Sequence, residues 1–182
     1  MEEKGLADNT VIILIGDNGY FLGERQLAGK WLMYEPSLRV PLIVYDPRER
    51  EGKRSQSFAL NIDVPATILD LAGQNPPKAW QGVSLNSPEL AKRKEFLTEH
   101  LWQTPIIPPS EAIRTRRWKY FRYINDPKHE ELYDLSADPQ ETVNLAQDPA
   151  YQAVLKNLRS RLEKKTKSYL EDRNKFDKAD LR

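Results

Sequence analysis

The chain of 182 residues contains no cysteine, only two histidines and no long apolar run. The absence of cysteine excludes a disulfide-based scaffold. No stretch approaches the roughly 20 consecutive apolar residues of a membrane-spanning helix. The 28 basic and 27 acidic residues give a formal net charge of +1, so no strong overall field attracts nucleic acid or anionic lipid. We therefore expect neither nucleic acid nor a membrane among the partners of this chain.

Glycine is scarce as well, but half of it is concentrated in one stretch. Four of the eight glycines follow the apolar run 11–15 within fourteen positions: Gly16, Gly19, Gly23 and Gly29. The apolar run predicts a strand buried on both faces, as found in parallel sheets. Glycine permits backbone angles and close approaches to a ligand that other residues do not. The cluster therefore predicts a loop with an unusual conformation or a bound ligand.

An acid and an amide, Asp17 and Asn18, come directly after this strand. Functional groups gather beyond the carboxyl ends of the strands in open α/β sheets, and carboxylate and amide oxygens suit a hard divalent cation. The same Asn-Gly step is a strong hairpin signal. Residues 20–30 lack the clean alternation of a paired return strand, and the next strand-like run is 40–45. The residues themselves leave a turn and a binding site equally open.

Other signals predict the remaining elements. Strands are expected at 10–16, 40–45, 96–100, 112–123 and 131–135, with a turn at 125–127. Asp63 is expected to cap a short helix that Gly73 closes, and Asp148 to cap a final helix with one apolar face. Residues 114–123 mix basic and aromatic side chains, a pattern that also suits single-stranded nucleic acid. The balanced charge favours a strand with packed aromatic residues and with basic ones facing solvent or substrate.

The segment 9–47 closely resembles the C-terminal part of the type I sulfatases, which belong to the alkaline-phosphatase-like superfamily. The motifs that carry the resemblance are residues 10–15, Asp-Asn-Gly at 17–19, Leu-Gly-Glu at 22–24, Gly-Lys-Trp at 29–31 and residues 39–43. The likeness continues at 63–73, 117–120 and 131–139. The resemblance covers nearly the whole chain, and it is strongest to the bacterial sulfatases that act on sulfated sugars.

The resemblance implies an α/β fold in two parts. Residues 1–95 would form the C-terminal portion of an alkaline-phosphatase-like, doubly wound sheet domain. Residues 96–182 would form a small α+β subdomain with antiparallel strands and a C-terminal helix. The partner implied for the full-length enzyme is a sulfated carbohydrate or an aryl sulfate.

The same resemblance assigns roles to three residues. Asp17 and Asn18 would be ligands of a Ca²⁺ ion whose complete shell needs an N-terminal half of the enzyme. Lys30 would contact the sulfate and stabilise the leaving oxygen. The N-terminal half would also supply a Cys or Ser, within a Cys/Ser-x-Pro-x-Arg motif, that is oxidised to the formylglycine nucleophile. This chain has no cysteine and no Ser-x-Pro-x-Arg sequence, so we expect a C-terminal fragment that is inactive alone.

Further candidates have ordinary alternatives. His100 is a candidate for the sugar rim of the pocket, or else a surface or structural histidine. Arg114 is a candidate contact to an anionic substrate, or else part of a packed strand. Trp102 would stack on a sugar ring or fill a core or interface. Arg25 stands where many relatives have a histidine, and arginine cannot exchange a proton near neutral pH; the alternative is a harmless exchange on an exposed loop.

Two other functions stay open beside the sulfatase interpretation. In the first, the chain is a fragment of another hydrolase of the superfamily, such as a phosphodiesterase or phosphonate hydrolase, which shares the metal ligands. Alternatively, it would be a non-catalytic binding module that exposes an unpaired sheet edge.

Overall fold

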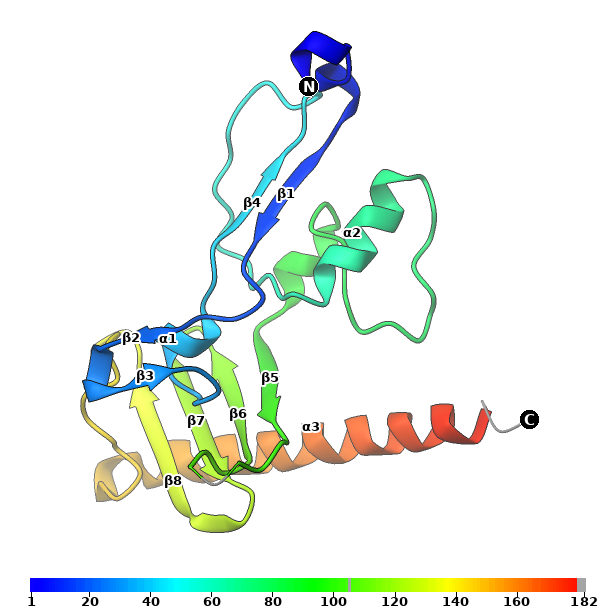
Figure 1. Cartoon of the computed structure of the whole chain (residues 1–182). Coiled ribbons are helices and arrows are strands. Elements are labelled where there is room, and N and C mark those ends of the chain that lie inside the picture. The colour runs from blue at the N-terminus through cyan, green and yellow to red at the C-terminus, as the bar shows by residue number, and fades with distance from the viewer. Residues whose placement is uncertain (105, 180–182) are drawn as a thin grey trace. The chain divides into compact units, whose positions relative to one another are not determined.

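A computed structural model describes residues 1–104 and 106–179 (Figure 1). The chain divides into two compact units. The first comprises Met1–Lys30 and Leu38–Lys94, and the second comprises Trp31–Ser37 and Glu95–Arg182. The short segment 31–37 therefore belongs to the second unit although the chain on either side of it belongs to the first. Nothing in the sequence pattern predicted that residues 31–37 belong to the second unit.

The first unit contains short strands and one regular helix. Its strands are β1 (Ile12–Ile15), β2 (Phe21–Leu22), β3 (Ala28–Gly29) and β4 (Leu42–Tyr45), and its helix is α2 (Asp63–Leu71). Four 3₁₀ turns complete it: η1 (Glu2–Lys4), η2 (Ala7–Asn9), η3 (Glu24–Gln26) and η4 (Pro88–Lys92). The strands expected at 10–16 and 40–45 and the helix expected after 62 are confirmed.

The pairing of β1 differs from the expectation. β1 and β4 form an antiparallel two-stranded ribbon in which Ile12 lies opposite Tyr45 and Ile15 opposite Leu42. Among the described residues β4 is its only hydrogen-bonded neighbour. Leu14 and Ile43 are each 57% exposed. The prediction of a strand covered on both faces is therefore wrong for this chain, because a two-stranded ribbon lacks the flanking strands that a buried parallel strand needs.

The start of α2 is held by an ion pair and not by a cap. Asp63 makes no capping hydrogen bond to the first turn of the helix, so that prediction is wrong. Its buried carboxylate instead accepts the backbone N–H groups of Leu60 and Val83 at 2.7 and 2.8 Å. It also binds the guanidinium of Arg93 through both oxygens, at 2.5 and 2.8 Å. Asp63 thus joins the helix to two loops of the first unit.

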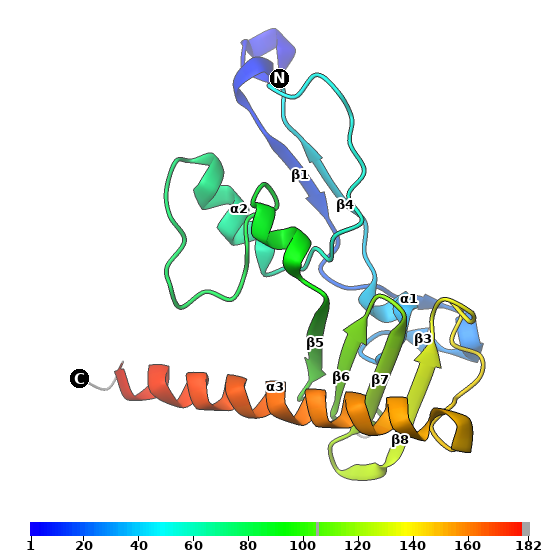
Figure 2. The same cartoon turned by 180° about the vertical axis from the view of Figure 1, so that it is seen from behind.

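The second unit is an antiparallel sheet covered on one face by a long helix (Figure 2). The strands β5 (Glu95–His100), β6 (Ser110–Thr115), β7 (Trp118–Tyr123) and β8 (Asp126–Asp134) pair in sequence order. The helix α3 (Gln152–Ala179) follows the 3₁₀ turn η5 (Pro149–Tyr151) and runs across the strands. The predicted strand 112–123 is in fact two strands, because residues 116–117 form a tight turn.

The core of this unit lies between the sheet and α3. Buried apolar side chains from both layers meet there: Ile113, Tyr120, Leu132, Leu155, Leu158 and Leu162. The expected apolar face of the final helix is confirmed. Asp148 accepts the N–H of Ala150 at 2.8 Å, as predicted for its capping residue. Among the described residues no helix combines the length and the apolar character needed to cross a bilayer.

A buried ion cluster ties the segment 31–37 to β7. The helical turn α1 (Glu35–Leu38) begins in this segment. The completely buried ammonium of Lys119 lies 2.8 Å from a carboxylate oxygen of Glu35 and 2.6 Å from one of Glu141. Arg114 adds a contact of 3.0 Å to Glu35. The basic side chains of 114–123 were expected to face solvent or substrate, which is wrong for Lys119 because two carboxylates neutralise it inside the unit.

The two carboxyl groups respond differently to burial. Burial by itself would raise the pKa of Glu35, but attraction to Lys119 and hydrogen bonds from Arg114 and Lys119 outweigh it and lower the pKa to about 2. Burial raises the pKa of Glu141 in spite of the attraction of Lys119. The ordinary pKa of Glu35 is 4.5. The charge of Glu35 therefore stabilises the fold above about pH 4.5, and this contribution is lost as the pH falls toward 2.

Replacing Lys119 by alanine should strongly destabilise the second unit. The substitution leaves the buried carboxylate of Glu141 without its cation and Glu35 with Arg114 alone, and the loss of one partner of a buried ion pair typically costs about 3–5 kcal/mol. Urea unfolding of the chain measures the loss. Lys92→Ala is the control, because Lys92 pairs with Glu89 at the surface and such pairs contribute about 0–1 kcal/mol. Equal losses in both variants would contradict the assigned role.

A Glu35→Gln chain should lose less stability than the parent between pH 4.5 and pH 2, because it lacks the charge that the parent loses over this range. Urea unfolding at several pH values measures this difference.

The exposed ribbon should be the less protected part of the chain. Hydrogen exchange should be faster for the amides of β1 than for those of 112–135, because the latter belong to a four-stranded sheet with a covered face. The apolar side chains of β1 and β4 should also promote self-association, which size-exclusion chromatography detects. A monomer whose slowest amides are those of β1 would show that this account of the ribbon is wrong.

Candidate functional site

The glycine-rich loop after β1 folds back as a small hairpin. β2 and β3 pair antiparallel, with Phe21 opposite Gly29 and Leu22 opposite Ala28. As expected, residues 20–30 hold no return strand for β1, which pairs with β4 instead. The short β2–β3 hairpin within 20–30 was not foreseen from the sequence. Two residue pairs are too short to give an alternating sequence pattern, which explains why the sequence did not reveal them. The hairpin returns the chain, so that residue 30 comes back to the start of the loop.

This return brings Lys30 to the residues that follow β1. The ammonium of Lys30 donates to Oδ1 of Asn18 at 3.0 Å. The backbone N–H of Asn18 donates to Oδ1 of Asp17 at 2.8 Å. The amide of Asn61, ahead of α2, donates to the backbone carbonyl of Asp17 at 2.7 Å. The first unit thus brings together the three residues on which the sequence analysis concentrated, and adds Asn61, which it missed.

The one sequence feature that pointed to Asn61 is its position two residues before the motif at 63–73. Its contact with the Asp17 carbonyl depends on the way α2 is anchored by Asp63 and Arg93. An anchor of this kind is a tertiary contact across thirty residues of chain. Local patterns do not reveal such contacts, so Asn61 was accessible only from the fold.

The oxygens of Asp17 and Asn18 suit part of a calcium shell. Ca²⁺ prefers carboxylate and amide oxygens and takes about 6–8 of them. Within residues 1–104 and 106–179, no group of three or more His, Cys, Asp and Glu side chains is arranged to hold a metal ion. The donor chemistry therefore fits, while the number of donors falls short of a complete shell. The contact of Lys30 with Asn18 places a fixed positive charge beside these oxygens.

Arg25 lies at the tip of the hairpin, in η3. Its φ is 57° and that of Gln26 is 60°. Two consecutive residues other than glycine with φ in the left-handed region are uncommon. The carboxylate of Glu24 accepts the N–H of Leu22 at 2.6 Å and so braces the turn. The exposed side chain of Arg25 thus stands on a tightly wound backbone at the hairpin end.

Three other candidates, Arg114, His100 and Trp102, lie in the second unit. Arg114 is bound by Glu35 in the buried ion cluster and keeps little exposed surface. The ring of His100, at the end of β5, stacks on that of Trp31, with centroids 5.5 Å apart and planes 9° from parallel. Nε2 of His100 is buried and has no hydrogen-bond partner among the described residues. Arg114 thus has a structural contact, whereas His100 sits in an aromatic group.

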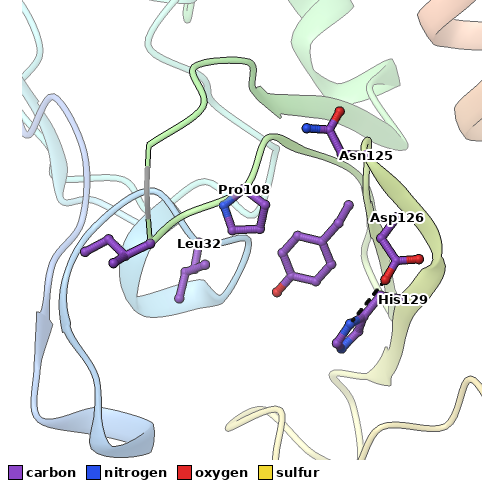
Figure 3. A pocket seen from close by; sticks show the side chains of 7 residues that line it. Leu32, Pro108, Asn125, Asp126 and His129 are labelled. Atoms are coloured by element: carbon purple, nitrogen blue, oxygen red, sulfur yellow. Dashed lines mark ion pairs between the residues drawn. The ribbon is translucent and has the colours of Figure 1, made fainter.

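A shallow pocket in the second unit was not foreseen from the sequence. Its volume is about 340 Å³. Figure 3 shows its apolar wall and its polar rim, formed by Leu32, Ile106, Pro108, Tyr123, Asn125, Asp126 and His129. Nδ1 of His129 lies 3.9 Å from Asp126, and both side chains are largely exposed. The lining residues come from three separate stretches of chain, so no single motif pointed to them.

Comparison with known proteins identifies the family. Residues 23–168 match the family described as N-sulphoglucosamine sulphohydrolase, C-terminal. The chain is 34% identical over 180 residues to the N-acetylglucosamine-6-O-sulfatase of Bacteroides thetaiotaomicron, covering 93% of this chain and 32% of that protein. It thus spans about a third of the length of this relative.

Solved structures give the same result. A complex with the substrate D-glucosamine-2-N,6-O-disulfate is similar with a TM-score of 0.79 at 32% identity, covering 93% of this chain and 36% of that one. The phosphonate monoester hydrolase of Silicibacter pomeroyi is similar with a TM-score of 0.78 at 28% identity, covering 90% and 36%.

These matches confirm the resemblance seen in the sequence and the α/β fold class that it implied. The structural neighbours include sulfatases of the alkaline-phosphatase-like type, and the chain combines antiparallel sheets with a C-terminal helix, as expected. Because the family match covers most of the sequence, the chain belongs to the sulfatases and corresponds to their C-terminal region.

Proposed function

We propose that this chain supplies the C-terminal part of a sulfatase site, with Asp17 and Asn18 as calcium ligands and Lys30 as the contact to sulfate. The observation that carries the proposal is the hydrogen bond of 3.0 Å between Lys30 and Asn18. It joins two motifs that lie twelve residues apart in the sequence. An oxygen pair for a cation and an ammonium for an anion are thereby held side by side in the first unit.

The chemistry of this pairing follows from charge. A sulfate ester is an anion, and its hydrolysis develops further negative charge on the bridging oxygen. Ca²⁺, when bound, polarises the sulfate oxygens as a Lewis acid. Lys30 provides a compact ammonium as a point charge for the sulfate and the departing oxygen. Asn18 orients this ammonium, and the hydrogen bond from Asn61 fixes the backbone of Asp17.

The nucleophile is expected from outside this chain. The chain has no cysteine and no Ser-x-Pro-x-Arg sequence from which a formylglycine would form. The remaining calcium ligands are likewise assigned to the N-terminal part of such an enzyme. The substrate that we propose for the whole enzyme is a sulfated amino sugar. Two names support this choice, since a relative is named N-acetylglucosamine-6-O-sulfatase and a similar solved structure is a complex with D-glucosamine-2-N,6-O-disulfate.

One observation favours a second candidate function. The similarity to a phosphonate monoester hydrolase is nearly as high as the similarity to the sulfatase complex. A phosphonate monoester is also a tetrahedral anion, so the same oxygen pair and ammonium would serve it. The match of residues 23–168 to a sulfatase family favours the sulfate ester.

The role of Lys30 can be tested in a chimera. This chain would replace the corresponding C-terminal third of the Bacteroides N-acetylglucosamine-6-O-sulfatase. Lys30→Ala should lower kcat for the sulfated sugar about 10²- to 10³-fold, as expected for the loss of a group that stabilises developing charge. Lys78→Ala is the control, because Lys78 is exposed on a loop. Equal activity of the two variants, with equal melting temperatures, would contradict the proposal.

The unfused chain should show no turnover of an aryl sulfate, because the nucleophile is expected from outside it.

Calcium binding by the chain alone should be weak. Two protein oxygens are a small part of the usual set, so we expect a Kd of roughly millimolar or above, as in the weakest natural calcium modules. Calorimetry measures this value, and Asp17→Asn should weaken it further by removing the only formal negative charge of the pair. Micromolar binding would mean that a complete shell exists within the chain, and the division of ligands proposed above would then be wrong.

A further inference from the structure

Three aromatic rings gather in the second unit, where Trp31, His100 and Trp102 form what we call the aromatic shelf. The ring of Trp31 contacts each of the other two rings. Its centroid is 5.5 Å from that of His100 and 6.5 Å from that of Trp102, with interplanar angles of 9° and 32°. Trp102 is 73% exposed and Trp31 is 39% exposed. Two large indole surfaces therefore face solvent next to each other.

The shelf is built on a fixed backbone. Trp31 has a φ of 84°, a conformation that a bulky residue adopts only when its surroundings impose it. Its N–H donates to the buried hydroxyl of Ser37 at 2.9 Å. Within the same segment, the Tyr34 hydroxyl donates to the Glu131 carboxylate at 2.9 Å, and Glu35 belongs to the buried ion cluster. Strain of this kind, held by several contacts, is typical of functional positions.

The shelf also contains a buried polar atom that no described residue satisfies. Nε2 of His100 has no hydrogen-bond partner within 1–104 and 106–179. In either tautomer this nitrogen is a donor or an acceptor, and buried polar groups in native proteins are nearly always paired. A second polar feature of this unit is the side-chain amide of Asn125, which donates to that of Gln103 at 3.1 Å. Gln103 directly follows Trp102, so an amide is covalently next to the more exposed indole.

We propose that the aromatic shelf binds a pyranose ring of the substrate by stacking on Trp102 and Trp31. One face of a pyranose presents C–H groups with slight positive charge, while the face of an indole is negative, so the two attract each other. The hydroxyls around the ring would remain available to polar groups such as the amide of Gln103, the residue after Trp102. The inference rests on the proposed function for the choice of a sugar, because Trp31 directly follows Lys30 in the sequence.

The polar surroundings favour a sugar over a protein partner. A protein interface buries a large apolar area with a central hydrophobic patch. The shelf offers two exposed indoles, and Gln103, which directly follows Trp102, carries an amide; a pyranose likewise has one apolar face and polar edges. Indole also carries little conformational freedom, so that stacking costs little side-chain entropy.

Binding can be measured on the chain itself with a neutral sugar. The probe is methyl N-acetylglucosaminide, followed by saturation-transfer NMR and by tryptophan fluorescence. We expect saturation to reach the C–H protons of the ring. Trp102→Ala should weaken binding about tenfold, the effect of losing one aromatic contact, while Trp102→Phe should retain most of it. Trp80→Ala is the matched control, because Trp80 is also exposed, at 45%, but lies in the first unit.

Each other outcome would overturn the proposal. Absence of transfer, or binding that is equal in the Trp102→Ala and Trp80→Ala chains, would show that the shelf does not hold sugar. Burial of Trp102 with rising protein concentration, seen as a blue shift of its fluorescence without sugar, would assign the shelf to self-association. Inorganic sulfate tests Lys30 separately from this proposal. If Lys30→Ala leaves the binding of inorganic sulfate unchanged, the role of Lys30 fails while the stacking of the neutral sugar stands.

Discussion

The buried ammonium of Lys119 holds together parts of the second unit that are far apart in the sequence. Its contacts to Glu35 and Glu141 join the segment 31–37 to the sheet and to the loop after β8. A charge taken out of water needs such partners, since their loss leaves an uncompensated ion inside the protein. The segment fixed in this way begins at Trp31, directly after Lys30. The cluster is therefore the structural support for the chain that leads out of the glycine-rich loop.

The sequence predicted those elements whose pattern is local and repeated. The apolar face of α3, its cap at Asp148 and the strands β5 and β8 follow from spacing and from turn residues, and all are present. The unpredicted features depend on distant contacts. Asp63 looked like a cap because of its place before a helix, but Arg93, thirty residues away, uses its carboxylate. Lys119 looked like a solvent-facing residue of a strand because its partners come from two other segments.

The candidate site was accessible from the sequence in a different way. Composition and spacing alone left Asp17 and Asn18 as a turn or a binding site, and family resemblance gave them roles together with Lys30. The structure adds how they meet, through the β2–β3 hairpin and the hydrogen bond from Lys30 to Asn18. The role of Asn61 and the grouping of Trp31 with the candidates His100 and Trp102 emerged only from the fold, because these contacts join residues far apart in the sequence. His100 was a candidate in isolation, and its stacking on Trp31 gives it a place in the second unit.

The central claim is that Asp17, Asn18 and Lys30 act together on a sulfate group. A crystal structure of the chimera described above, grown with Ca²⁺ and inorganic sulfate, tests it most directly. The account predicts a calcium ion with an oxygen of Asp17 and the Oδ1 of Asn18 at about 2.3–2.6 Å. It also predicts the ammonium of Lys30 within about 2.7–3.2 Å of a sulfate oxygen. A calcium ion bound without these two residues, or a sulfate that Lys30 does not touch, would contradict it.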